Sequence, residues 1–201
     1  MGRLILIRHA ESEGNAIRVF TTTPESLDLT NLGRRQAALA AASVKEMFQP
    51  AKVVTSTFKR ARETGRIIAE AIGVPTEIEA DLRERDVGEL AGQSYDSVLN
   101  DPGYEPKLSW LWRPKGGESL VEVMGRAGPV LDRIAARHRD EEIVIVSHGG
   151  VMRSLWAHVT GSWEGAHIPP NCGIVLVEHS SGRYHPPRVV SGEPTEKEAG
   201  G

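Results

Sequence analysis

The stretch Leu4-Ile5-Leu6-Ile7-Arg8-His9-Ala10-Glu11-Ser12 begins with an apolar run that stops at an arginine and a histidine. Four consecutive apolar residues are typical of a strand that is buried on both faces of a sheet. The run therefore places a fixed cation and a possible nucleophile where a buried strand meets solvent. In an open α/β sheet, ligands bind outside the carboxyl ends of the strands, so we expect chemistry at this edge.

The same pattern occurs again late in the chain. Ile143 to Val146 form a second apolar run, which leads through Ser147 into His148-Gly149-Gly150. A single histidine near a strand end is more often a hydrogen-bonded structural residue, but two such histidines indicate a shared site. Arg60 is expected in the first turn of a helix that follows another short strand, so its guanidinium can reach the same edge. Converging arginines and histidines suit a phosphate dianion.

The rest of the chain alternates strand and helix patterns. Strands are expected at 52–56, 75–78, 174–177 and 188–190, and helices at about 33–48, 58–72 and 120–134 and after 150. This alternation predicts an α/β fold, with one domain over residues 1–190. Residues 95–117 show neither the helical nor the strand spacing of apolar residues and are expected to form an excursion or flap. Residues 191–201 are polar and are expected to be a disordered tail.

Composition argues against several classes of partner. The 201 residues carry a formal charge of −3, with 24 Lys and Arg against 27 Asp and Glu, so there is no basic field for nucleic acid or an anionic membrane. The apolar runs are far shorter than the roughly 18 residues of a membrane span. Met1-Gly2-Arg3 leads directly into a strand, so we expect a cytoplasmic protein. The lone Cys172 excludes intrachain disulfides and a multi-cysteine metal site.

Six short motifs occur in the order LIRHAESEGN (6–15), LTNLGRRQA (29–37), TSTFKRARET (55–64), LRERDVG (82–88), GGES (116–119) and VSHGG (146–150). Together they resemble the histidine phosphatase superfamily, also called phosphoglycerate mutase-like, over residues 3–180. The resemblance implies a three-layer α/β/α sandwich, with a mostly parallel central sheet and helices on both faces. The chain departs from the family at Ala10, where glycine is commoner, and at Thr21-Thr22, where many mutases have Thr-Gly.

The resemblance also implies roles for individual residues. His9 matches the histidine that is phosphorylated during turnover, Arg8 and Arg60 match the arginines that grip the phosphoryl group, and His148 matches the second histidine of the pocket. Neutral imidazole is a good nucleophile near pH 7, and a phosphoenzyme divides one difficult displacement into two easier ones. Fixed guanidinium groups can stabilise the charge of the transferring phosphoryl group without a metal.

Glu84 matches the carboxylic acid that protonates the leaving oxygen, and Asp86 or Glu89 nearby could serve instead. A positioned carboxylic acid is needed because an alkoxide is a poor leaving group, and its conjugate base can then activate water against the phosphohistidine. Further substrate contacts are implied for Asn15, Thr21 and Gly149.

The resulting functional prediction is a phosphoric monoester hydrolase of the histidine acid phosphatase type, which hydrolyses small phosphomonoesters through phospho-His9 without a metal or cofactor. Its expected ligands are a small phosphorylated metabolite and inorganic phosphate. The alternative is a phosphoglycerate mutase that uses the same phosphohistidine, although the chain is shorter than those mutases and lacks room for their insertion after the acidic motif. A third hypothesis is a non-catalytic phosphate-binding module. The physiological substrate and assembly as a homodimer remain open.

Overall fold

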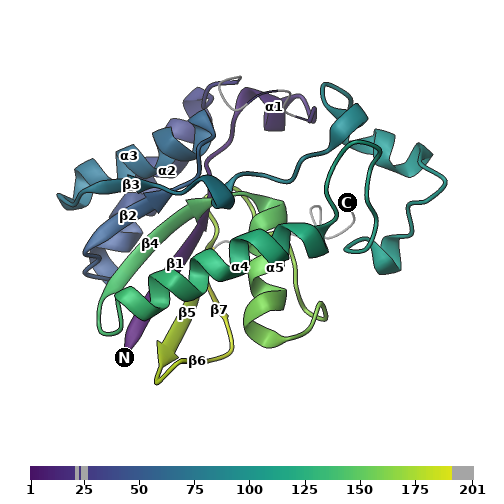
Figure 1. Cartoon of the computed structure of the whole chain (residues 1–201). Helices are drawn as coiled ribbons and strands as arrows, with labels where there is room; N and C mark the ends of the chain where they lie inside the picture. The colour runs from purple at the N-terminus through teal and green to yellow at the C-terminus, as the bar shows by residue number, and fades with distance from the viewer. Residues whose placement is uncertain (21–22, 24–26, 192–201) are drawn as a thin grey trace.

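The computed structural model describes residues 1–20, 23 and 27–191. One central sheet is built from β1 (Gly2–Arg8), β2 (Lys52–Thr55), β3 (Thr76–Ile78), β4 (Glu142–Ser147), β5 (Ile174–Ser180), β6 (Arg183–Tyr184) and β7 (Arg188–Ser191) (Figure 1). The strand order is β3-β2-β4-β1-β5-β6, and β7 also pairs with β5. The opening apolar run is thus a central strand with a partner on each side.

The sheet divides into two parts at β1. β3, β2, β4 and β1 are parallel, whereas β5 runs antiparallel to β1 and both β6 and β7 run antiparallel to β5. The reversal has a local cause, because Cys172 N–H donates to the carbonyl of Arg8 and Gly173 O accepts from Arg8 N–H. The chain therefore reaches the carboxyl end of β1 before β5 begins, and β5 must run back. The antiparallel part is larger than the predicted, mostly parallel sheet implies.

Helices cover both faces of this sheet. They are α1 (Glu13–Ala16), α2 (Asn31–Met47), α3 (Lys59–Ile72), α4 (Leu120–Arg137) and α5 (Gly149–Thr160). Side chains of successive strand residues point to opposite faces, so Leu4 and Leu6 pack under α4 and α5 while Ile5 and Ile7 pack under α2 and α3. The three-layer α/β/α class is confirmed.

Local signals set most of the helix ends. The Thr30 hydroxyl accepts a 2.9 Å hydrogen bond from Gly33 N–H at the start of α2, and Gly73 ends α3 with a φ of 76°. The helix predicted from residue 58 begins one residue later, because Phe58 is its extended N-cap. The sequence prediction missed α1 and β6. Ser191 ends β7 rather than opening the tail, and the other tail residues, 192–201, lie outside the described residues.

The predicted excursion forms part of a rim beside the carboxyl ends of β1 and β4 (Figure 1). Residues 95–117 contain the 3-10 turns η3 (Tyr95–Asn100) and η4 (Pro106–Leu108), with no α-helix or strand. The loop after α1 is joined to it, since Phe20 N–H donates to Gln93 O at 2.9 Å and Tyr95 N–H donates to Arg18 O at 2.9 Å. None of the helices in the described part of the chain is long and apolar enough to cross a bilayer.

Gly33 provides a test of how tightly α2 is docked. A Cβ atom at this position would lie 2.0 Å from the backbone oxygen of Glu11, in the loop that follows His9. Since backbone must move to relieve that overlap, Gly33→Ala is expected to lower the free energy of unfolding by about 1–3 kcal/mol. Urea unfolding monitored by circular dichroism measures the change.

The matched control is Gly125→Ala in α4, where an added Cβ meets nothing within 4 Å. Helix propensity alone then predicts a gain of up to about 1 kcal/mol. Equal stability of Gly33→Ala and the wild type would show that α2 is not held against Glu11.

Candidate active site

The two histidines of the sequence motifs lie side by side at the carboxyl ends of neighbouring parallel strands. Arg8 is opposite Ser147 in the β1/β4 register, and His9 and His148 are the residues that follow. Their ring centroids are 5.1 Å apart with an interplanar angle of 59°. Their exposed fractions are only 2% and 0%. The parallel pairing of β1 with β4 is therefore what brings residues 139 positions apart into one buried pair.

Hydrogen bonding fixes the tautomer of His9. Its Nδ1 lies 2.7 Å from the carbonyl oxygen of Ala10, and Nε2 lies 3.0 Å from the donating Nε of Arg60. A carbonyl can only accept, so Nδ1 carries the proton and Nε2 keeps its lone pair. Burial, together with the positive charges of Arg60 and Arg8, lowers the pKa of His9 well below its usual 6.5. His9 is a neutral imidazole at pH 7.

Two arginines supply the positive charge of the site. Arg60 lies in the first turn of α3, is 4% exposed, and has its guanidinium carbon 4.7 Å from the ring centroid of Phe58. Burial lowers the pKa of Arg60, and the nearby Glu84 and Tyr95 partly offset this effect. A guanidinium nevertheless stays charged in proteins. Arg8 ends β1 and donates from Nη1 to Pro169 O at 2.8 Å. The site thus pairs permanent cations with neutral imidazoles.

His148 is the N-cap of α5 and is held by Ser56. Its Nε2 lies 2.6 Å from Ser56 Oγ, which also accepts from Phe58 N–H at 3.2 Å. Its Nδ1 is buried without a hydrogen-bond partner among residues 1–20, 23 and 27–191. Burial, Arg60, His9 and Arg8 lower the pKa of His148 well below 6.5. Sequence reasoning missed Ser56, whose only signal is its place before Arg60 in the TSTFKRARET motif.

Glu84 lies against the first turn of α5, the helix that His148 caps. Its Oε1 accepts from Arg85 N–H at 2.8 Å, and an added Cβ on Gly150 would come within 2.8 Å of the same oxygen. The alternative acids have other partners: Asp86 accepts from Gly88 N–H at 2.9 Å, and Glu89 pairs with Lys115 at 2.8 Å. Of the three carboxylates, Glu84 is the one that lies against the first turn of α5 and acts on the charge of Arg60.

Three residues, Asn15, Thr21 and Gly149, are predicted to make further substrate contacts. Gly149 is the first residue of α5, directly after His148, whereas Thr21 lies outside the described residues. Asn15 donates from Nδ2 to Tyr95 OH at 3.1 Å, so its amide links α1 to the excursion. Asn171, which sequence reasoning missed, donates to His9 O at 2.8 Å. No sequence motif pointed to Asn171. The roles of all these residues in substrate binding stay predictions.

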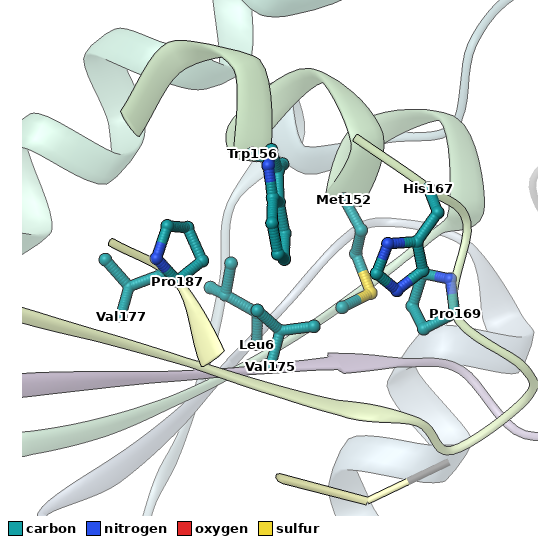
Figure 2. A pocket seen from close by; sticks show the side chains of 8 residues that line it. All are labelled: Leu6, Met152, Trp156, His167, Pro169, Val175, Val177 and Pro187. Atoms are coloured by element: carbon teal, nitrogen blue, oxygen red, sulfur yellow. The ribbon is translucent and has the colours of Figure 1, made fainter. Parts of the chain in front are cut away.

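Two hollows of the molecule lie elsewhere. Figure 2 shows one between α5 and the sheet, too narrow for a water molecule and lined by Leu6, Met152, Trp156, His167, Pro169, Val175, Val177 and Pro187. The other, about 470 Å³, lies at the amino ends of β1, β2 and β4, where Arg3, Glu142 and Asp140 are among its lining residues. Neither hollow contains the two histidines. No group of three or more potential metal ligands occurs among the described residues.

Comparison with known proteins gives one family. The model for the histidine phosphatase superfamily (branch 1) matches residues 4–190. A metal-independent phosphoserine phosphatase of Arabidopsis thaliana is 33% identical over 163 residues, covering 78% of this chain and 68% of that protein. A 2,3-bisphosphoglycerate-dependent phosphoglycerate mutase of Nitrobacter hamburgensis is 34% identical over 162 residues, covering 76% and 78%. A solved mycobacterial glucosyl-3-phosphoglycerate phosphatase, complexed with VO3, matches with a TM-score of 0.81 and 26% identity, covering 96% of this chain and 99% of that one.

The buried neutral histidines predict a loss of stability in mild acid. Unfolded histidine titrates near pH 6.5, whereas the folded pKa values of His9 and His148 are lower. Below about pH 6.5 the unfolded state therefore binds more protons, and each histidine lowers stability by up to about 1.4 kcal/mol per pH unit until its folded pKa is reached. Urea unfolding in phosphate-free buffer at pH 7.5, 6.5 and 5.5 measures the slope.

The His148→Gln variant isolates one of the two contributions. Its stability should fall less steeply between pH 6.5 and 5.5 than that of the wild type, by up to about 1.4 kcal/mol per pH unit. Between pH 7.5 and 8.5, where the histidine pair does not titrate, the two slopes should agree. Identical slopes in the acid range would mean that His148 is not kept neutral by the fold.

Proposed function

The chain belongs to the histidine phosphatase superfamily, branch 1, and from that membership we propose that it is a metal-independent phosphatase that transfers the phosphoryl group of a small phosphomonoester to His9. One observation carries the proposal. His9 is a buried, neutral imidazole whose Nε2 lone pair lies beside the Arg60 guanidinium and whose ring lies next to His148. That arrangement combines a nucleophile with the charges that a phosphoryl dianion requires.

In the first step, Arg60 Nε–H transfers its hydrogen bond from His9 Nε2 to a phosphoryl oxygen, the freed Nε2 lone pair attacks phosphorus, and the bond from phosphorus to the ester oxygen breaks. Arg8 and Arg60 neutralise the phosphoryl oxygens. His148 is assigned a hydrogen bond to the same group from Nδ1, which is buried and has no partner among the described residues. Glu84 gives its carboxyl proton to the leaving oxygen, which departs as an alcohol.

In the second step, the Glu84 carboxylate takes a proton from water. The water oxygen attacks the phosphorus of phospho-His9, the phosphorus–nitrogen bond breaks, and inorganic phosphate is released. His9 then regains the lone pair on Nε2, while Nδ1 keeps its proton, hydrogen-bonded to the Ala10 carbonyl, throughout. Water is the only co-reactant of the cycle.

The proposed substrates are small phosphorylated metabolites. The near-complete burial of His9 and His148 supports a small substrate, because a phosphorylated side chain on a folded protein could not reach them easily. Relatives named for phosphoserine and glucosyl-3-phosphoglycerate are consistent with this class. A cytoplasmic location and assembly as a homodimer remain predictions from the sequence.

The alternative function is a phosphoglycerate mutase, which the Nitrobacter relative keeps open. Hydrolysis is favoured because the structural match covers 99% of a solved phosphatase chain. A missing insertion does not separate this chain from the Nitrobacter mutase, since the aligned 162 residues cover 78% of that protein. In a mutase the phosphoenzyme must wait for a rotated acceptor, whereas a phosphatase exposes it to water.

Phosphohistidine formation is tested by trapping. Brief incubation with ³²P-labelled substrate should give an acid-labile, alkali-stable phosphoenzyme, because phosphorus is bound to imidazole nitrogen. His9→Ala should remove the label and lower kcat by roughly three orders of magnitude or more. The control is His138→Gln, at the C-terminal cap of α4, which should label normally. Label that persists on His9→Ala would remove His9 from the role of nucleophile.

A substrate panel distinguishes the two enzyme classes. We expect phosphate release from small phosphomonoesters such as phosphoserine and 3-phosphoglycerate, with EDTA present throughout, since arginines rather than a metal neutralise the phosphoryl group. ³¹P NMR with 2- and 3-phosphoglycerate follows hydrolysis and isomerisation together. Interconversion that is faster than phosphate release would show that the chain is a mutase. If no substrate of the panel releases phosphate or isomerises between pH 5 and 8, the non-catalytic phosphate-binding module is the hypothesis that remains.

A further inference from the structure

The Gly116-Gly117-Glu118-Ser119 motif has no part in the chemistry proposed above, yet its carboxylate is mostly buried. Glu118 and Arg126 of α4 form an ion pair at 2.8 Å, with side-chain exposures of 20% and 12%. The pair is bidentate, because Arg126 Nε also donates to the second Glu118 oxygen at 2.9 Å. Such planar pairs are both strong and directional.

The remaining Arg126 protons are directed at the segment that carries Glu84. Nη1 donates to the carbonyls of Asp81 at 2.7 Å and Arg83 at 2.9 Å, and Nη2 donates to the carbonyl of Glu84 at 3.1 Å. With the two bonds to Glu118, all five N–H groups of a guanidinium are used. A substitute that lacks this planar fork cannot make the same set of bonds.

Glu118 holds the same segment from its other end. Its Oε2 accepts from Asp86 N–H at 3.0 Å, its own N–H donates to Asp86 O at 2.8 Å, and its carbonyl accepts from Arg85 Nε at 2.7 Å. Burial raises the pKa of Glu118, but Arg126 and the Asp86 N–H outweigh it and lower the pKa overall, so the carboxylate is ionised. Glu84 is therefore held on both sides. Its own carbonyl accepts from Arg126, and the next residue, Arg85, donates to the carbonyl of Glu118.

The other residues of the motif explain how this contact forms. A Cβ on Gly117 would lie 2.5 Å from Asp86 O, so the two backbones can approach only if residue 117 has no side chain. Ser119 caps α4 and accepts from Glu122 N–H, and Arg126 lies two helical turns further along. The motif thus supplies the carboxylate and also starts the helix that carries its arginine.

We propose that Glu118 and Arg126 are positioning residues for the general acid: they hold the backbone of residues 81–86 so that the Glu84 carboxyl meets the leaving oxygen. The proposal rests on the function proposed above for Glu84. Neither residue hydrogen-bonds to His9, Arg8 or Arg60 in the described structure. Displacement of an acid by about 1 Å can cost roughly 100-fold in rate, so the clamp should matter more for proton transfer than for phosphate binding, on which Arg126 acts only through its weak charge effect on His148.

The experiment compares leaving groups. For each variant, kcat/KM is measured with p-nitrophenyl phosphate, whose leaving group needs little protonation, and with an alkyl phosphate, whose leaving group needs much. Glu84→Gln is the reference and should lower the alkyl rate by about 10²–10⁴-fold with a far smaller effect on the nitrophenyl rate. Arg126→Met and Glu118→Gln should shift the ratio of the two rates in the same direction, by roughly 10-fold or more. Inhibition by vanadate should change far less than the ratio of the two rates.

The ratio of the two rates is independent of how much of a sample is folded, because both substrates are measured on the same protein. A variant that is merely unstable therefore leaves the ratio unchanged. Arg133→Met is the matched control, since it removes another ion pair of α4, to Glu79 at 2.6 Å, and none of the bonds from α4 to the carbonyls of residues 81–86. Arg126→Lys should recover only part of the ratio, because a lysine cannot reproduce the fork.

The outcomes separate the two proposals. Equal losses on both substrates, or no loss, in Arg126→Met and Glu118→Gln would overturn the positioning role while leaving Glu84 as the acid. A Glu84→Gln variant without leaving-group dependence would overturn both the acid and its positioning. A wild type that releases no phosphate from any substrate would instead contradict the proposed function.

Discussion

The site depends on one hydrogen bond between neighbours in the chain, from His9 Nδ1–H to the carbonyl of Ala10. This bond decides which ring nitrogen keeps a lone pair, and Arg60 then holds that nitrogen at 3.0 Å. The Ala10 carbonyl is itself oriented from outside, since the N–H of the same peptide unit, that of Glu11, donates to Gln36 Oε1 in α2, while Ala10 N–H donates to Thr64 Oγ1 in α3. Two helices therefore hold the backbone that sets the tautomer, and α3 also supplies the arginine. Ala10 departs from the family pattern only in its side chain, which packs with Leu29 and Ala37, and its backbone makes both bonds.

The charge balance of the site follows from this arrangement. Two guanidinium groups lie close to two imidazoles whose pKa values are lowered by burial and by those same arginines. Positive charges with few counter-charges are costly in a low-dielectric site, and a phosphoryl dianion supplies the missing negative charge. The protein thus keeps a locally unfavourable charge distribution where a ligand compensates it, as is usual for functional sites. The depressed pKa values also keep His9 a nucleophile, which a protonated imidazole cannot be.

Sequence reasoning reached the features that short segments determine. The buried runs of β1 and β4, the capping serine at 119 and the convergence of His9, His148 and Arg60 at one sheet edge follow from local pattern and parallel pairing. The features that it missed depend on tertiary contacts between distant segments. Ser56 reaches His148, 92 positions away, and Asn171 reaches His9, 162 positions away, and no periodicity encodes either distance. The antiparallel half of the sheet depends in the same way on where residues 172 and 173 meet Arg8.

The excursion is tied to the chemistry by residues adjacent to the reacting groups. Arg85, next to Glu84, stacks on Trp112 with its guanidinium carbon 4.6 Å from the ring centroid, and Asn15 bonds Tyr95. Trp112 is 8% exposed and lies edge-on to Tyr104, so it packs inside the excursion. A change in the excursion that alters substrate choice would therefore also shift the Glu84 side chain, unless the Glu118–Arg126 pair keeps the backbone of residues 81–86 in place. A rigid anchor between the acid and the excursion allows substrate-selecting loops to vary while the position of the acid is kept.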